Sequence, residues 1–464
     1  MNFNPWTLFS DFCIMSALLV LGLILRAKLK LFQKFLIPAS LIAGFIGLAL
    51  GPNGYNILPL SNRLGTYAGI LIVVVFAAMP IGDKPSKKQL SGPALGGMFL
   101  NVTGIAIAQY GLGMAFSLYV LNRFWNLNSG FGLMLATGFY GGHGTAAAVG
   151  SIYKDLGWND ALGLGMTSAT VGIIGGIIMG IIIINWGTRK GYTHYVGSPK
   201  DLPKELRTGL ISLEDQRHGG KITVSSICVD PMAFHLALVL LASLGGYYLS
   251  KYITSIIPRL KIPAFCLSLL FGFIIQFVLS KTDSLKYVDR YTISRISGIA
   301  TDYLIIAGVS SVKLSLVATY LLPLILLFSF GFLINWLWFL WVGARSSQED
   351  WFERNMMAFG HASGVVATGI LLQRVVDPDL KSRGMEDSGI ADIFNRPIII
   401  ALQVIPPLLL VNGGMWPHIV TWVCIGAVIV MLFISKKLHW WNPSAELKVY
   451  NCAKSNFENQ QQVS

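Results

Sequence analysis

Residues 137–145, with the sequence Thr-Gly-Phe-Tyr-Gly-Gly-His-Gly-Thr, decide how this chain folds, because glycine fills three of the four positions from Gly141 to Gly144 inside an apolar run. Each glycine destabilises a helix by roughly 1 kcal/mol relative to alanine, so this stretch favours a helix that breaks. A break exposes free carbonyls from one half-helix and free amides from the next. Carbonyls and hydroxyls such as that of Thr145 suit Na⁺, whereas amides at a helix N-terminus suit a carboxylate. The alternative interpretation is a close helix crossing through small residues.

The rest of the chain has the composition of a polytopic membrane protein. Of its 464 residues, 54% are hydrophobic and 12% are charged, whereas soluble domains carry roughly 25% charged residues. The formal net charge of +13 lies in loops and the tail, where such charge sets membrane orientation, so we expect no nucleic-acid partner. The five cysteines are scattered without CxxC spacing, which predicts neither a disulfide framework nor a metal site.

Apolar runs long enough to cross the roughly 30 Å hydrocarbon core of a bilayer recur along the chain. Two further stretches, 130–153 and 356–374, are apolar but rich in Gly, Ala, Ser and Thr. We expect both to be re-entrant, because with an outward N-terminus only seven of the 35 Lys and Arg residues then face outward. This arrangement places the central linker and the C-terminus in the cytoplasm. The expected spans are 6–25, 35–51, 66–81, 94–120, 160–186, 232–250, 260–280, 298–312, 316–343, 397–411 and 417–435.

Two short motifs occur twice in the same order. Ile37-Pro38-Ala39 recurs as Ile262-Pro263-Ala264, and Gly142-His143 recurs as Gly360-His361. They predict an all-α protein of two repeats, each with five spans and one re-entrant stretch. An odd number of spans inverts the second copy, as in many secondary transporters. The expected units are a first repeat at 1–188, a cytoplasmic linker at 189–231, a second repeat at 232–412, and an extra span with a polar tail at 413–464. We expect the tail after Trp441 to be disordered.

The candidate binding residues lie mainly in the two Gly-rich stretches. His143 and His361 occupy matching positions and face each other across a site if the repeat holds; otherwise they are buried structural hydrogen-bonders. Two histidines without clustered carboxylates or thiolates make a poor zinc site. The expected residues are Thr137, Gly141, Gly142, His143, Gly144 and Thr145 in the first stretch, and Gly360, His361, Ala362, Ser363 and Gly364 in the second.

Polar groups elsewhere in apolar runs are further candidates. Asp302 is placed to hold a cation or a substrate ammonium, and Arg374 either pairs with a substrate carboxylate or anchors an inner loop. Asn101 is a further candidate, although amides such as Asn101, Gln109 and Gln403 can simply join helices. Arg396 is counted among the inner-loop charges.

The chain resembles the bacterial sodium–glutamate symporters (the glutamate:Na⁺ symporter family). The resemblance rests on the Ile-Pro motifs, on Tyr140–Ala148, on Gly360-His361 and on Met166–Gly176. It implies a homodimeric inner-membrane carrier, similar in fold to the 2-hydroxycarboxylate transporters, in which a mobile transport domain slides past a fixed scaffold and imports L-glutamate with Na⁺. It also implies substrate and ion at Gly141–Thr145 and Gly360–Ser363, with Na⁺ near Gly142, Thr145 and Ser363. The chain departs from the family pattern at 365–369, where Val-Val-Ala-Thr-Gly replaces further glycine and a Thr-Pro-Thr element.

Three other functions remain open at this point. A carrier of another di- or tricarboxylate, such as malate or citrate, differs from a glutamate carrier in needing no partner for an ammonium group. An intramembrane hydrolase would use Ser363 with a histidine, the pairing of nucleophile and base that acyl transfer needs. A passive channel is the third alternative.

Overall fold

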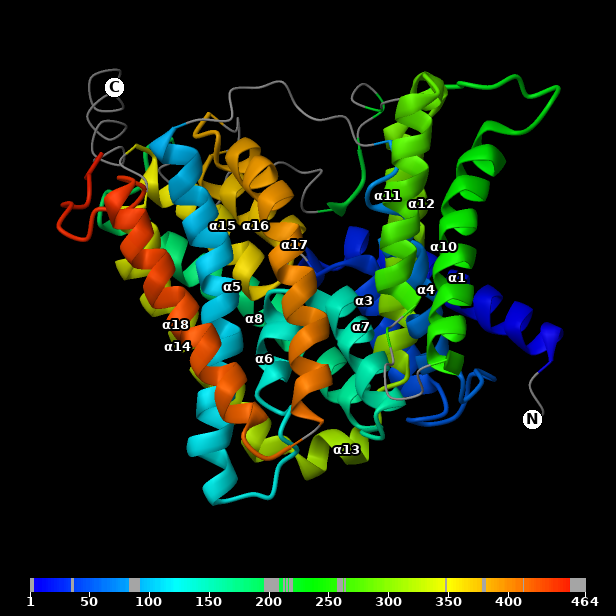
Figure 1. Ribbon diagram of the computed structural model, residues 1–464, viewed down its shortest axis with the longest axis horizontal. Helices are drawn as coiled ribbons and strands as arrows, with labels where there is room; N and C mark the ends of the chain where they lie inside the picture. Colours follow the sequence, from blue (N-terminus) through cyan, green and yellow to red (C-terminus); the bar gives the residue numbers. More distant parts are fainter. Residues whose placement is uncertain are drawn as a thin grey trace.

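The computed structural model describes residues 4–34, 37–82, 92–195, 208–211, 213, 216, 220–256, 262, 264–346, 349–377, 381–411 and 413–450. Within these ranges the regular elements are all helices, as Figure 1 shows. The helical architecture expected from the composition is confirmed. Parts of the linker expected at 189–231, namely 196–207, 212, 214–215 and 217–219, and the tail beyond Tyr450 lie outside the described residues.

The helices form two groups that lie side by side (Figure 1). The first body, on the right of the figure, consists of α1 (Pro5–Lys28), α3 (Ala39–Leu50), α4 (Leu64–Ala78), α10 (Pro231–Ile256), α11 (Ala264–Lys281) and α12 (Arg290–Ser310). The second body consists of α5 (Pro93–Tyr119), α6 (Leu133–Phe139), α7 (Gly142–Asp155), α8 (Ala161–Arg189), α14 (Leu321–Trp341), α15 (Trp351–Ser363), α16 (Val366–Val376), α17 (Gly384–Leu410) and α18 (Trp416–Lys437). The short α2 (Lys30–Lys34) follows α1, and α13 (Leu314–Thr319) links α12 to α14.

Eight described helices are long and apolar enough to cross a membrane, namely α1, α5, α8, α10, α11, α14, α17 and α18. The chain is therefore a multi-pass membrane protein. The spans expected at 35–51 and 66–81 are the shorter apolar helices α3 and α4. Apolar side chains of α4, α7, α11 and α12 share one buried cluster, which includes Ile72 and Phe76 of α4 and Ala147 of α7 and joins the two bodies.

Helix α8 lies at the centre of the second body because glycines on one of its faces permit close packing. A Cβ atom at Gly172 or at Gly176 would lie 2.6 Å from an atom of Ser363 in α15. A Cβ atom at Gly180 would lie 2.5 Å from the side chain of Leu372 in α16. These glycines recur every fourth residue, so they share one face of the helix. Side chains there would push α15 and α16 away from α8.

Two helices differ from the apolar runs that predict them. Helix α17 begins at Gly384 rather than at 397. Its first half is polar and carries Asp392 and Arg396, so an apolar run does not mark it, but it is helical and packs beside α5. The run at 316–343 is divided at Tyr320 into α13 and α14. An apolar count alone misses a helix whose polar half is covered by other helices.

The expectation that the tail after Trp441 is disordered is wrong as far as Tyr450. Residues 442–450, here called the C-terminal strap, lie against the second body. The indole nitrogen of Trp351 donates a hydrogen bond to the Lys448 carbonyl at 3.0 Å, and the amide of Asp350 donates to the Tyr450 hydroxyl at 2.9 Å. The Tyr450 amide donates to the Gly191 carbonyl at 2.8 Å. The strap therefore joins the end of α8 to the start of α15.

We predict that Tyr450→Ala lowers the thermal stability of the protein. The change removes the hydroxyl that accepts from Asp350 and a ring that stacks on His194 with centroids 4.2 Å apart. A hydrogen bond and an aromatic pair together contribute about 1–3 kcal/mol. The measurement is thermal unfolding of the purified protein in detergent. Val449→Ala is the control, because its neighbouring side chain is exposed; equal melting temperatures for the two variants would contradict the prediction.

Candidate functional site

Each Gly-rich stretch forms a helical hairpin with a break at its tip. Hairpin 1 consists of α6 and α7, separated at Tyr140 and Gly141, and hairpin 2 consists of α15 and α16, separated at Gly364 and Val365. In hairpin 2 a Cβ atom at Gly360 would lie 2.6 Å from the Cα of Gly369, so its two helices run back alongside each other. The breaks expected from the glycine content are present in both stretches.

The two tips touch. Gly142 has a φ of +61°, in the left-handed region that favours glycine, and a side chain there would collide with Val365 of hairpin 2. The ring of Tyr140 stacks on His361 of hairpin 2, with centroids 4.6 Å apart and planes 20° from parallel. The Tyr140 hydroxyl also accepts a hydrogen bond from the amide of Asn395 in α17. Three elements far apart in sequence therefore meet at one place.

A cavity of about 290 Å³ lies at this meeting point. Its polar wall comes from the two hairpin tips and α17, all in the second body, and its apolar wall includes α4 of the first body. It thus lies on the boundary between the two bodies. The lining residues of the tips are Tyr140, Gly141, Gly144, Thr145, His361, Val365 and Val366; those of α17 are Asp392, Arg396, Ile399, Ile400 and Gln403; those of α4 are Ile72, Val75, Phe76 and Met79.

Helix α17 supplies the charges of the cavity. Asp392, Asn395, Arg396 and Gln403 share one helical face, since residues three, four, seven and eleven positions apart are neighbours on a helix surface. The Arg396 Nε lies 3.3 Å from a carboxylate oxygen of Asp392. The Gln403 amide nitrogen donates to the Thr145 hydroxyl at 3.1 Å. The side-chain oxygens of Asn395 and Gln403 are buried, and neither has a hydrogen-bond partner among the described residues.

This arrangement offers partners for both signs of charge. A guanidinium such as that of Arg396 matches a carboxylate in shape and charge, and a carboxylate such as Asp392 matches an ammonium. Helices α7 and α16 begin at the tips without a side-chain cap, so free backbone amides are present there as well. The uncapped amides and Arg396 favour anionic groups, whereas the oxygens of Thr145 and Gln403 suit a hard cation.

Four residues predicted from sequence line the cavity: Gly141, Gly144, Thr145 and His361. Gly142 and Gly364 form the contact between the tips immediately beside it. His143 turns instead to α8, where its Nε2 lies 3.1 Å from the Thr170 hydroxyl. The two histidines therefore have different surroundings, because His361 stacks on Tyr140.

The other predicted residues lie away from the cavity wall. Thr137 donates to the Met134 carbonyl at 3.2 Å, and Ser363 donates to the Phe359 carbonyl at 2.9 Å. Asn101 of α5 bonds to Asn355 of α15, away from the tip of hairpin 2, at 3.0 Å. Outside the hairpin tips, Asp302 shares a hydrogen bond with Ser40 in the first body, and Arg374 lies in the last turn of α16. Gly360 and Ala362 are buried within α15.

Sequence reasoning missed Asp392, Asn395 and Arg396 as site residues. The apolar run predicts a span that begins at 397, which places Arg396 among the loop charges and makes Gln403 an amide that joins helices. The available signal was the spacing of these polar residues, which continues the helical period backwards from the apolar run. That signal was weak because Pro397 interrupts the run.

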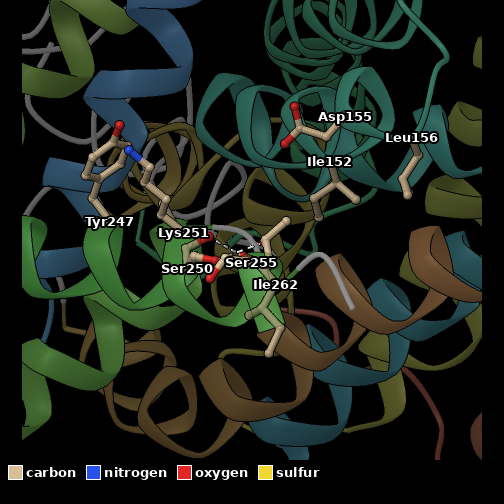
Figure 2. A pocket seen from close by; sticks show the side chains of 10 residues that line it. Ile152, Asp155, Leu156, Tyr247, Ser250, Lys251, Ser255 and Ile262 are labelled. Carbon is tan, nitrogen blue, oxygen red and sulfur yellow. Dashed lines mark hydrogen bonds between the residues drawn. The ribbon is translucent and has the colours of Figure 1, made fainter. Parts of the chain in front are cut away.

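A larger cavity of about 600 Å³ lies elsewhere between the two bodies, against the end of α7 and the ends of α10 and α11 (Figure 2). Its lining includes Asp155 and Lys251, on opposite walls in the figure. The Ser250 hydroxyl donates to the Ile262 carbonyl at 2.6 Å, and the Thr254 hydroxyl donates to the Ser250 carbonyl at 2.9 Å. The hydroxyl hydrogens of Ser250 and Thr254 are thus already used within the protein, and neither hairpin tip lines this cavity. The smaller cavity is the better candidate site.

A known protein family matches most of the chain. Residues 6–370 match the sodium/glutamate symporter family. No curated protein matches the chain. The matched range includes hairpin 1 and the tip of hairpin 2 but ends before α17, so it does not extend to the polar face of α17. Because the match spans most of the chain, the protein belongs to the sodium/glutamate symporter family, a family of transporters that couple glutamate to Na⁺.

Proposed function

We propose that this protein imports L-glutamate together with Na⁺ through the cavity between the hairpin tips, α17 and α4. The observation that supports this site best is the pairing of Arg396 and Asp392 on its wall. In the proposed complex Arg396 binds one carboxylate of glutamate and Asp392 binds its ammonium group. The uncapped amides at the start of α7 and α16 bind the second carboxylate.

We place the coupling Na⁺ beside Thr145 and Gln403. The Thr145 hydroxyl and the unpartnered oxygen of Gln403 are oxygen ligands in contact with the tip of hairpin 1. Backbone carbonyls near Gly142 would complete the site. Ser363 is omitted from this proposal, because its hydroxyl donates to Phe359 and accepts from Asn335.

The architecture supports an elevator mechanism. The same order of elements occurs twice: α1, α3 and α4 precede α5, hairpin 1 and α8, and α10, α11 and α12 precede α14, hairpin 2 and α17. We propose that these are inverted repeats with the boundaries given above, and that the second body carries solute past the first. The site lies between the bodies, as such sliding requires.

The surroundings of the protein follow from the same proposal. The first body would be the dimer scaffold, and its exposed apolar side chains on α10 and α11, among them Tyr248 and Phe277, are available to a second copy of the chain or to lipid. The N-terminus would face outward, and the linker and C-terminus would lie in the cytoplasm of a bacterium, with the protein in its inner membrane. The lysines that end α18 fit an inner position.

Asp392 distinguishes the main alternative. Malate and citrate carry no ammonium group, so a cavity for them gains nothing from a carboxylate on its wall. The hydrolase alternative lacks support, since the chain belongs to a transporter family and Ser363 bonds to a carbonyl rather than to a histidine. A passive channel would fail to accumulate solute against a gradient.

We predict that Arg396→Gln raises the KM for glutamate about tenfold to 100-fold, because the substrate carboxylate loses a charged hydrogen-bond partner. The measurement is radiolabelled glutamate uptake into proteoliposomes under an inward Na⁺ gradient. Arg383→Gln is the control, since the exposed Arg383 at the start of the same helix pairs with Glu386 and does not line the cavity. Equal KM values for the two variants would place the substrate elsewhere.

We predict that Asp392→Asn changes selectivity rather than abolishing binding. Loss of the carboxylate removes the partner of the ammonium, so competition by aspartate should weaken about tenfold or more, whereas competition by malate should hold or improve. The measurement is inhibition of labelled glutamate uptake by each compound. A uniform loss for both compounds contradicts an ammonium contact at Asp392.

We predict that Thr145→Val raises the Na⁺ concentration needed for half-maximal uptake by about tenfold, since one oxygen ligand is removed. Glutamate KM at saturating Na⁺ should stay close to the wild-type value. Thr137→Val is the matched control, because the Thr137 hydroxyl bonds to Met134 away from the cavity. Wild-type uptake that is equal in sodium and choline buffers would reject Na⁺ coupling itself.

A further inference from the structure

A bridge of two buried amides lies behind the tip of hairpin 2. Gln109 of α5 and Asn335 of α14 are 0% and 2% exposed. The Gln109 amide nitrogen donates to the Asn335 oxygen and to the Ala362 carbonyl, both at 2.7 Å. The Asn335 nitrogen in turn donates to the Ser363 hydroxyl at 3.1 Å. Two consecutive residues of hairpin 2 are thereby bonded to two different helices.

The bridge satisfies a group that the broken helix leaves open. Ala362 is in the last turn of α15, where a carbonyl has no partner within the helix. Buried carbonyls without a hydrogen bond are strongly unfavourable in an apolar interior. Gln109 supplies the closer donor at 2.7 Å, and the Asn335 nitrogen lies 3.5 Å from the same carbonyl. The Ser363 hydroxyl donates to Phe359 and accepts from Asn335.

The bridged residues lie between the two parts of hairpin 2 that shape the cavity. His361, just before them, stacks on Tyr140 and lines the cavity. Val365, just after them, meets Gly142. A shift of Ala362 and Ser363 would therefore move both cavity-forming residues together.

We infer that Gln109 and Asn335 are positioning residues, which hold the tip of hairpin 2 fixed to α5 and α14 so that His361 and Val365 stay at the site. Neither amide lines the cavity, and both act through the backbone of Ala362 and the side chain of Ser363. Hairpin 2 accordingly moves as one unit with α5 and α14. This inference rests on the proposed function, since it concerns the position of the same site.

The first test is Gln109→Met, which keeps the length of the side chain and removes its hydrogen-bond donor. We expect the KM for glutamate in proteoliposomes to rise about tenfold, with a smaller change in the maximal rate, since the site is displaced rather than dismantled. Thr103→Val is the matched control: Thr103 is also fully buried on α5, and its hydroxyl has no partner among the described residues. A glutamate KM for Gln109→Met equal to that of Thr103→Val would overturn the inference.

The second test is Gln109→Glu, with uptake measured from pH 5.5 to pH 8. A protonated glutamic acid still donates one hydrogen bond to Ala362 or Asn335, whereas an ionised one repels both oxygens. Uptake relative to wild type should therefore recover as the pH falls, which a general packing defect would not produce. A pH profile parallel to that of wild type would overturn the inference. Failure of the wild-type protein to take up glutamate with Na⁺ would reject the proposed function instead, so the two failures are distinguishable.

Discussion

The contact between two broken helices is the constraint on which the rest of this structure depends. The helices of hairpin 1 and hairpin 2 are interrupted at their tips. Gly142 of one tip lies against Val365 of the other, with no room for a side chain between them. Stacking of Tyr140 on His361 adds a second contact across the same junction. Because both helices end there, backbone groups that a continuous helix would bind internally face one small volume. The glycine face of α8 is needed to bring hairpin 2 this close.

The position of the charges follows from the same junction. Helix α17 passes beside both tips, and its polar face lines the cavity there, where Asp392 and Arg396 lie near each other in an otherwise apolar region. Charged side chains within a membrane protein are unfavourable unless they pair or face a cavity, and here both conditions are met. Proline at 397 follows directly in the same helix. The cavity between the hairpin tips is thus lined on its polar side by one polar helix and two interrupted ones.

Much of the fold could be predicted from sequence because its signals are local. Apolar length marks the spans, and the glycines at 141, 142 and 144 mark the first break. The second break, at Gly364, lies within the stretch 356–374 that the sequence predicts to be re-entrant, although glycines are sparser there. Side-chain direction could not be predicted, because it depends on neighbours brought in by the fold. His143 and His361 match in sequence, yet one bonds to Thr170 and the other stacks on Tyr140.

The polar half of α17 could not be predicted from sequence for a related reason. A charged segment next to an apolar run has the same composition whether it is a loop or a helix covered by protein, and only the packing against α5 distinguishes the two. The ordered strap could not be predicted either, since its polar composition is typical of a free tail. What anchors it is a pair of aromatic side chains, Trp351 and Tyr450, that hydrogen-bond to backbone atoms of the partner segment.

That strap has a practical consequence for handling the protein. Membrane proteins are commonly shortened to their last apolar helix, or fused there to a reporter, before purification. Here a cut directly after α18 would remove the residues whose hydrogen bonds join the start of α15 to the end of α8. A reporter joined after Ser464 leaves these contacts intact. The strap packs on the helical body that carries both hairpin tips.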